Sequence, residues 1–331
     1  MPASRLSGAP GILQLSSPLK ERHLPGDGVQ TAQFNSLLAE KELRLLAEWL
    51  GGHPKVELRA YGGYDGSWTD LEFLRFFPDV RRVSIDNRYT LESIDGIRFL
   101  SDQLESLTLG ATRRTQSLAP LTRFAALRSL YVEGRVRDTD AIGELRALEH
   151  LTLRSITLPK LELLRPLSRL RTLDIKLGGT KDLRPLGDIG TIEYLELWMV
   201  KGLEDLSPIS RLTSLRYLFL QALSRVAALP DFSRCERLER VHIEKLKSLS
   251  DLTPLLTARG LVDLAFVDMP QLRWEHVACL REHPTLTGVS LGTGSARRNA
   301  ELSDGLGLGP VPGLSPELVL LRSGDLDSVA D

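Results

Sequence analysis

Apolar residues recur along the chain in one short phrase: an apolar residue, two variable residues, an apolar residue, one variable residue and a further apolar residue. Ten copies follow one another at intervals of 21 to 25 residues, and all their anchors are aliphatic or Phe. A repeat of this length is typical of a solenoid, in which each unit buries its apolar side against its neighbours. The alternation at the end of the phrase predicts one β-strand per repeat. The anchors are Val80-Val83-Ile85, Leu104-Leu107-Leu109, Leu127-Leu130-Val132, Leu148-Leu151-Leu153, Leu170-Leu173-Ile175, Ile192-Leu195-Leu197, Leu215-Leu218-Leu220, Leu238-Val241-Ile243, Leu261-Leu264-Phe266 and Leu286-Val289-Leu291. A degenerate eleventh copy is expected at Val56-Leu58.

A second pattern lies between the strand phrases and predicts short helical turns. An Asp or Ser is followed by Leu, a variable residue, Pro and an aliphatic residue in the ranges 117–121, 182–186, 205–209 and 251–255. Asp and Ser side chains can accept hydrogen bonds from free backbone N–H groups at a helix start. Proline is tolerated in a first helical turn, where its missing N–H costs little. The spacing of about three residues between apolar positions favours a 3₁₀ or single-turn helix.

Together the two patterns resemble the leucine-rich-repeat proteins, in particular the short, internalin-like class with repeats of about 22 residues. The resemblance covers Val56 to Leu291. It implies an α/β repeat solenoid: a right-handed coil with a concave parallel β-sheet and short helical or 3₁₀ segments on the convex side. The chain departs from the family where the family usually carries Asn, three residues after the last strand anchor. Here the positions are Thr112, Arg135, Ile156, Gly178, Val200, Leu223, Leu246, Met269 and Gly294. We therefore expect a packed turn rather than a hydrogen-bonded one.

The ends of a solenoid expose its core and need caps, and this sets the predicted domain organisation. We expect a flexible N-terminal segment at 1–33 and an N-terminal capping helix at 34–52, with Asn35 as its N-cap. The solenoid of about eleven repeats spans 53–292. A C-terminal cap at 293–309 and a flexible tail at 310–331 follow. The aromatic stretch 61–68 is expected to be a loop that packs on the N-terminal cap, although an edge-loop binding role stays open.

Composition excludes several classes of function. The net charge is −1 with 26% charged residues, so the basic excess typical of nucleic-acid binders is missing. Two cysteines are too few for a disulfide framework, and no apolar run is long enough for a signal peptide or a membrane span. We expect a cytoplasmic protein that binds neither nucleic acid nor membrane. Arg outnumbers Lys 33 to 9, which favours a bacterial origin.

Two clusters could carry chemistry. In-register strands place Asp174 beside Glu196, and paired carboxylates are the groups of a glycoside-hydrolase-type site. The interpretation we favour is structural, because the surface is open and Lys176 and Arg154 stand in the adjacent row to neutralise the acids. His276, Cys279 and His283 have a spacing compatible with metal ligands on one helix face, but they lie on a convex segment whose neighbours belong to the core. We therefore expect no catalytic residues, no cofactor and no metal.

The concave face offers the better candidate site. Side chains between the strand anchors point away from the core, and large aromatic residues gather there on neighbouring strands. Exposed aromatic residues in polar surroundings are typical of protein-binding hot spots. The predicted partner-binding residues are Tyr194, Glu196, Trp198, Tyr217, Phe219, Gln221, Arg240 and His242. The sequence thus predicts a non-enzymatic, monomeric scaffold that binds a partner protein. The alternatives are a hydrolase that uses the paired carboxylates and a self-associating structural protein.

Overall fold

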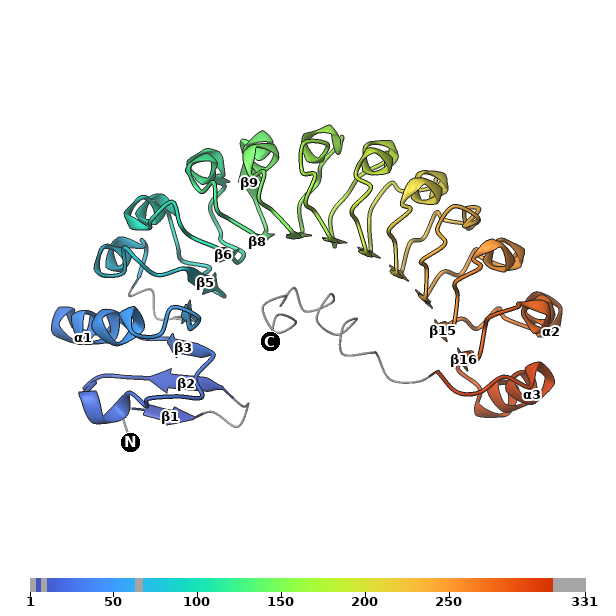
Figure 1. Cartoon of the computed structure of the whole chain (residues 1–331), viewed down its shortest axis with the longest axis horizontal. Coiled ribbons are helices and arrows are strands. Elements are labelled where there is room, and N and C mark those ends of the chain that lie inside the picture. Colours follow the sequence, from blue (N-terminus) through green and yellow to red (C-terminus); the bar gives the residue numbers. More distant parts are fainter. Residues whose placement is uncertain (1–3, 7–10, 63–67, 312–331) are drawn as a thin grey trace. The chain divides into compact units, whose positions relative to one another are not determined.

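The computed structural model describes residues 4–6, 11–62 and 68–311. The chain divides into two compact units, Met1–Leu148 and Glu149–Asp331, called here the first and the second unit. In each unit the strands form one layer and the helical segments a second layer (Figure 1). Each unit curves so that its strands lie on the inner side, the concave face, and its helical segments on the outer side. The predicted α/β repeat architecture is confirmed.

The first unit contains a sheet in the order β1-β2-β3-β4-β5-β6-β8. Strand β1 pairs with β2 in antiparallel fashion, and the strands that follow pair in parallel. A separate parallel pair, β7 and β9, lies outside this sheet. The strands are β1 (Ser4–Leu6), β2 (Ile12–Leu15), β3 (Thr31–Phe34), β4 (Glu57–Tyr61), β5 (Arg82–Asp86), β6 (Ser106–Leu109), β7 (Gln116–Ser117), β8 (Ser129–Glu133) and β9 (Val136–Arg137). The helical segments are η1 (Glu21–His23), α1 (Glu40–Gly51), η2 (Glu72–Phe76), η3 (Asp95–Phe99), η4 (Ala119–Arg123) and η5 (Thr139–Glu144).

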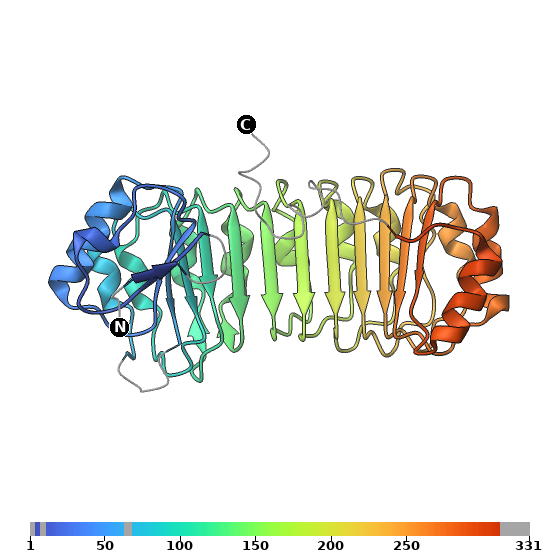
Figure 2. The same cartoon turned by 90° about the horizontal axis from the view of Figure 1, so that it is seen from below.

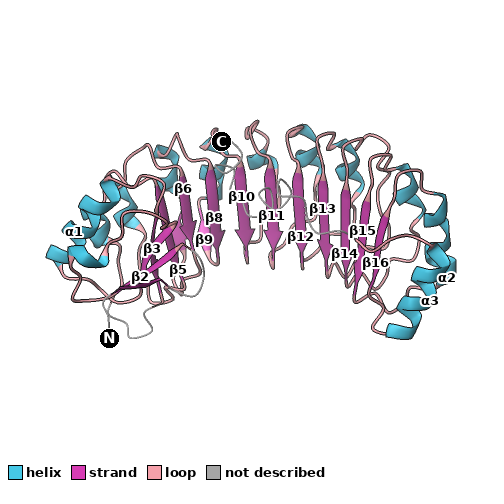
Figure 3. Cartoon of the chain, turned by 60° about the horizontal axis from the view of Figure 1, so that its bottom comes forward, coloured by secondary structure: helices cyan, strands magenta, loops and turns pink. Residues whose placement is uncertain are grey.

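The second unit contains a parallel sheet in the order β10 to β16, with every strand beside the next one along the chain (Figure 2). The strands are β10 (His150–Arg154), β11 (Thr172–Lys176), β12 (Tyr194–Trp198), β13 (Tyr217–Gln221), β14 (Arg240–Glu244), β15 (Asp263–Val267) and β16 (Gly288–Leu291). The helical segments are η6 (Glu162–Leu164), η7 (Arg184–Asp188), η8 (Ser207–Arg211), η9 (Thr253–Thr257), α2 (Trp274–Val277), η10 (Ala278–Glu282) and α3 (Ala296–Leu306). Figure 3 shows these helices on the side of the strands away from the concave face.

The strand anchors form the core in register. Leu195 pairs with Leu173 on one side and Leu218 on the other, and Leu197 pairs likewise with Ile175 and Leu220. All of these side chains are buried. Since one side of a strand carries every second residue, this burial fixes which residues face the concave side.

The Asp/Ser–Leu–x–Pro–Leu pattern forms 3₁₀ segments with Pro in the first turn, in η4, η7, η8 and η9. The acidic residue that opens the pattern binds backbone N–H groups as expected. Asp182, Asp205 and Asp251 each accept a hydrogen bond of 2.8 to 2.9 Å from the N–H two residues on. The predicted helical turns are confirmed.

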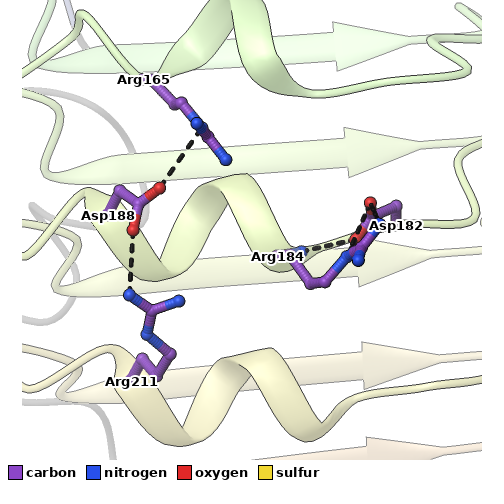
Figure 4. A network of polar contacts seen from close by, with 5 residues as sticks. All are labelled: Arg165, Asp182, Arg184, Asp188 and Arg211. Carbon is purple, nitrogen blue, oxygen red and sulfur yellow. Dashed lines mark hydrogen bonds and ion pairs between the residues drawn. The ribbon is translucent and has the colours of Figure 1, made fainter.

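Ion pairs join neighbouring helical segments on the outer side of the second unit (Figure 4). The Asp188 carboxylate lies 3.3 Å from Arg165 Nε and 2.9 Å from Arg211 Nη2, so it links three successive repeats. Asp182 and Arg184 pair within one segment at 2.7 Å. These groups are exposed for the most part, so solvent screens each pair and its contribution to stability is small.

The turn after each strand replaces the family's Asn with packing. Ile156, Val200, Leu223, Leu246 and Met269 are all buried, which confirms the packed turn expected from the sequence. The residue before each of them, like Leu177 before the buried Gly178, adopts a left-handed conformation, with φ between 49° and 58°. These left-handed residues are Ser155, Leu177, Met199, Ala222, Lys245 and Asp268. The backbone N–H groups of the first five bond the next repeat, as Met199 N does to Gln221 O at 2.9 Å.

The N-terminal region differs from the sequence prediction. Within the segment 1–33, expected to be flexible, β2 and most of β3 extend the parallel sheet, with Leu13, Leu15 and Ala32 buried. That part of the prediction is wrong, because β2 pairs with β3 and β3 with β4, which buries their apolar residues without a full repeat phrase. The helix in the range 34–52 begins at Glu40 rather than at Asn35. The Glu42 carboxylate stabilises its start by accepting a hydrogen bond from Ala39 N at 2.7 Å.

The aromatic stretch 61–68 falls partly outside the described residues, at 63–67. Trp68 at its end is buried, with its ring 5.3 Å from that of Phe34 and 5.2 Å from that of Phe73. Trp68 therefore packs into the first unit's core. At the other end, α3 lies within the range predicted for the C-terminal cap, and the predicted tail falls outside the described residues from 312 onward.

Candidate functional site

The eight predicted site residues come together on three adjacent strands of the second unit, β12, β13 and β14. We call them the concave cluster. Their register forms three rows across the strands, because parallel strands carry equivalent residues side by side. The rows are Tyr194–Tyr217–Arg240, Glu196–Phe219–His242 and Trp198–Gln221. The buried anchors occupy the alternate positions, so all eight residues belong to the concave face.

The exposure of the cluster differs from the sequence prediction. Tyr194, Tyr217 and Phe219 are only 1%, 2% and 6% exposed, and Glu196 and Arg240 are buried as well. The expectation of exposed aromatic residues is therefore wrong for these positions. Trp198, Gln221 and His242 are partly exposed. In this structure a partner can contact these three side chains. The five buried ones become accessible only if whatever covers them moves away.

Ring contacts tie the cluster together. The rings of Tyr194 and Tyr217 meet edge to face, with centroids 5.1 Å apart, and Phe219 stacks on His242 at 4.4 Å. The Arg154 guanidinium on β10 lies 5.5 Å from the Trp198 ring, within the range of a cation–π contact. Aromatic pairs of this kind contribute about 0.5–1.5 kcal/mol beyond their buried area. The cluster is thus a preorganised surface rather than a set of independent side chains.

A lysine joins the two candidate catalytic carboxylates. Lys176 Nζ lies 3.4 Å from Asp174 Oδ2 and 3.1 Å from Glu196 Oε2. Thr152 Oγ1 donates a hydrogen bond of 2.9 Å to Asp174, and Tyr194 Oη donates one of 2.9 Å to Glu196. Both acids therefore have fixed partners within the sheet. This agrees with the structural role that the sequence favoured for them.

Burial perturbs the titration of this group. Desolvation, with help from the neighbouring Glu196 carboxylate, raises the pKa of Asp174 from 3.8 to about 6, although Lys176 and Thr152 act in the opposite direction. Desolvation and the Glu196 charge also raise the pKa of the Tyr194 hydroxyl. A hydrolase pair requires one acid and one free carboxylate on either side of a substrate. Here a cation bridges the two, so the arrangement is that of a structural ion triad.

Polar contacts continue on the other flank of the cluster. Gln221 Nε2 donates a hydrogen bond of 2.7 Å to Glu244, and His242 Nε2 lies 3.8 Å from the same carboxylate. Arg240 pairs with Asp263 on β15 at 3.4 Å. Glu244 and Asp263 were not among the predicted site residues. Their positions in the same two rows, one strand further on, are the signal that could have included them.

The candidate metal ligands do not converge. His276 Nδ1 accepts a hydrogen bond from Arg273 N at 2.9 Å, and Cys279 Sγ contacts the His276 carbonyl oxygen at 3.6 Å. His283 is buried, with Nε2 3.1 Å from the Ala258 carbonyl oxygen and Nδ1 accepting from Leu286 N at 3.1 Å. Across residues 4–6, 11–62 and 68–311, no group of three His, Cys, Asp or Glu side chains is placed to hold a metal ion. The spacing reflects one helical segment that packs on the core.

Comparison with known proteins places the fold. No model of a protein family matches the chain, and no curated protein matches it. Solved structures do match. An internalin C2 of Listeria monocytogenes is 22% identical with a TM-score of 0.49, over 60% of this chain and 84% of that one. Another internalin of the same organism is 17% identical with a TM-score of 0.48, over 86% and 78% of the two chains. A leucine-rich-repeat protein of Leptospira interrogans is 17% identical with a TM-score of 0.55, over 74% and 68%.

The likeness to the Leptospira structure concerns the fold alone, and it agrees with the repeat phrase, the parallel strands and the 3₁₀ turns. Among the described residues, no helix has the length and apolar character needed to cross a membrane. The resemblance predicted from the repeat phrase is confirmed at the level of the fold: this chain is a leucine-rich-repeat solenoid.

Proposed function

We propose that the protein is a non-enzymatic interaction scaffold and that it binds a partner protein through the concave cluster of the second unit. One observation carries the proposal: the strand register brings four large aromatic residues and three charged or titratable side chains together on the face opposite the described helices of the second unit. Aromatic residues and Arg, surrounded by polar groups, are the composition of protein-binding hot spots. A monomeric state and the cytoplasmic location and bacterial origin expected from the sequence are part of the proposal.

The geometry favours this function over the two alternatives. Lys176 neutralises the Asp174 and Glu196 carboxylates at 3.4 and 3.1 Å, so a hydrolytic reaction would first have to move the Lys176 ammonium group away from them. A self-associating solenoid commonly stacks through an open end of its sheet. At the C-terminal end of the second unit, α3 and the backbone pair Gly288–Gly309 adjoin the last strand β16. The concave cluster is therefore the better docking surface.

Partner affinity tests the proposal. A partner recovered from a cell lysate is identified by mass spectrometry, produced in pure form and titrated against the full chain. Trp198→Ala is the informative substitution, because this side chain is partly exposed and is not a core anchor. We expect a loss of about 2 kcal/mol or more, roughly a thirtyfold rise in Kd, while the melting temperature stays close to that of the wild type.

The matched control is Val267→Ala on β15. Val267 occupies the same row as Trp198, two strands beyond Gln221, and is 37% exposed. Its removal should leave binding intact. Tyr217→Ala and Phe219→Ala are poor probes because both side chains are buried, so their loss also lowers stability. If Trp198→Ala and His242→Ala both remain folded and bind the partner normally, the cluster is not the binding site.

A further inference from the structure

The burial of the concave cluster exceeds what the described elements supply. A side chain on the open face of a single sheet has neighbours beside and below it but none above. The helical segments of the second unit lie on the opposite side of the sheet (Figure 1, Figure 3). Tyr194, Tyr217 and Phe219 are nevertheless 1%, 2% and 6% exposed. Contacts within the sheet protect ring edges, but the upper surface of each ring needs a cover of its own.

The cover is local. On the same face, Val267 on β15 is 37% exposed and Ser290 on β16 is exposed. Thr172 and Asp174 on β11, by contrast, are buried along with the cluster. A general curvature of the sheet would protect all strands of the unit alike. Burial that runs from His150 on β10 to Arg240 on β14, and ends before Val267 and Ser290, instead points to a segment that lies across these strands.

The path of the chain leads toward this face. After α3, the backbone returns to the sheet, where Gly309 pairs in parallel with Gly288 at the beginning of β16. Gly309 O accepts a hydrogen bond of 2.9 Å from Val289 N, and Gly309 N donates one of 3.0 Å to Thr287 O. Gly288 belongs to the row that runs through Arg240, Tyr217 and Tyr194. The chain therefore continues beyond residue 311 from the edge of the sheet that carries the cluster.

Residues 312–331 have the length and composition of a suitable occupant. Strands β16 and β12 are four spacings apart, or about 19 Å. Twenty residues can span up to about 66 Å, so the segment reaches every strand of the second unit. It contains the aliphatic run Leu318–Leu321, which belongs to no repeat phrase and would expose a contiguous apolar patch if it stayed in water. Four aliphatic side chains are well suited to cover the faces of Tyr217 and Phe219.

We propose that the segment 312–331 docks on the concave cluster of its own chain, with the aliphatic run Leu318–Leu321 over Tyr217 and Phe219. The segment is then an intramolecular ligand that competes with the partner. This inference rests on the proposed function for its regulatory meaning, but the docking itself can be measured without a partner. It also explains why aromatic side chains on a recognition surface are buried.

Oxidative footprinting of the full chain tests the docking. Hydroxyl radicals modify aromatic side chains in proportion to their exposure, and mass spectrometry reads Tyr217 and Phe219 separately. The test variant replaces the aliphatic run, L318S/V319S/L320S/L321S, and the matched control replaces polar residues of the same segment, S315A/S323A/S328A. We expect severalfold more modification of Tyr217 and Phe219 in the test variant and no change in the control. A synthetic peptide of residues 312–331 added to the test variant should restore protection, and a scrambled peptide should not.

Three outcomes overturn the inference. Equal modification of Tyr217 and Phe219 in the wild type and the test variant, with matching melting curves, shows that the aliphatic run does not cover them. Protection in the wild type that disappears on dilution assigns the cover to a second copy of the chain. If the fourfold variant fails to fold, Leu320→Ser alone is measured in the same way, and unchanged modification again contradicts the docking.

The experiments distinguish a failure of the docking of segment 312–331 from a failure of the proposed partner binding. If the test variant loses protection but no partner is sensitive to Trp198→Ala, the segment docks and the proposed function is wrong. If protection is unchanged while a partner depends on Trp198, the function stands and the docking is wrong. If both hold, the test variant should bind the partner more tightly than the wild type does.

Discussion

At the scale of single residues, the turns after the strands of the second unit combine good packing with backbone strain. Each has one residue in the left-handed region, and none of the six from Ser155 to Asp268 is a glycine. This conformation is costly for most side chains, and Gly, Asn and Asp tolerate it best. The buried residue that follows it, such as Val200 or Leu223, holds the turn in place. Core packing by that residue here offsets the local cost of the left-handed backbone.

Met199 offers the clearest test of this strain. It has a φ of 49° and a side chain that is 46% exposed, so little burial is lost on substitution. Met199→Asn should raise the free energy of unfolding by about 0.5–1 kcal/mol, because Asn adopts the left-handed region more readily. Chemical denaturation measures the change. Met199→Ala keeps the strain and should bring no gain, and a gain of equal size in both variants would contradict the explanation.

The raised pKa of Asp174 implies that the free energy of unfolding depends on pH. Its pKa in the folded protein is about 6, above the ordinary value of 3.8, so the folded state holds a proton that the unfolded state releases between these two values. The contribution of this group to stability therefore falls as the pH rises from about 4 to about 6. Asp174→Asn imitates the protonated form and should remove that fall. We expect the variant to gain roughly 1–3 kcal/mol relative to the wild type between pH 4 and pH 7, at about 1.4 kcal/mol per pKa unit. Parallel stability profiles of the two proteins would argue against a buried, desolvated Asp174.

At the scale of elements, the sequence was informative wherever a whole repeat phrase was present. Anchors such as Leu195 and Leu197 predicted strand, register and face correctly, because period-two burial leaves only one arrangement of the sheet. The strands β2 and β3 were missed, because Leu13 and Leu15 or Ala32 and Phe34 make only two-residue alternations. Such short patterns become recognisable once β4 is in place to pair with them.

The candidate site, too, could be predicted only in part. Its eight positions follow from register, and the structure brings them together as predicted. Their burial could not be predicted, because it depends on contacts above the face rather than on the alternation within the strands. Lys176 was expected near the carboxylates, but the bridging geometry requires the actual side-chain positions.

The burial of helix α1 leads to a prediction about the stability of the first unit. Leu46 is fully buried in it, whereas Leu37, just before the helix, is 53% exposed. Leu46→Ala should lower the free energy of unfolding by about 2–4 kcal/mol through lost burial and the cavity that remains. Leu37→Ala serves as the control and should change it by less than about 0.5 kcal/mol. Equal effects in thermal and chemical denaturation would show that α1 does not close the core.

At the scale of the whole molecule, packing between repeats is the main source of stability, and both cysteines are free. Cys235 is buried, and desolvation raises the pKa of its thiol to about 11, so it stays protonated and unreactive. Chelator or reductant should therefore leave the melting temperature unchanged in calorimetry. A shift of several degrees on adding chelator would revive the site at His276, Cys279 and His283.

The return of the chain to β16 at Gly309 has a consequence for how selective the concave surface can be. A segment tethered there is present at a local concentration on the order of 1 mM, whatever the abundance of the protein. If the free peptide bound with a Kd of about 100 µM, the tethered one would occupy the surface about nine-tenths of the time and weaken every competing ligand about tenfold. A partner with an intrinsic Kd of about 10 nM would still bind at about 100 nM, whereas chance encounters of about 100 µM would fall to about 1 mM. The tethered segment therefore sets a minimum affinity that a partner must have, and this minimum does not depend on the expression level.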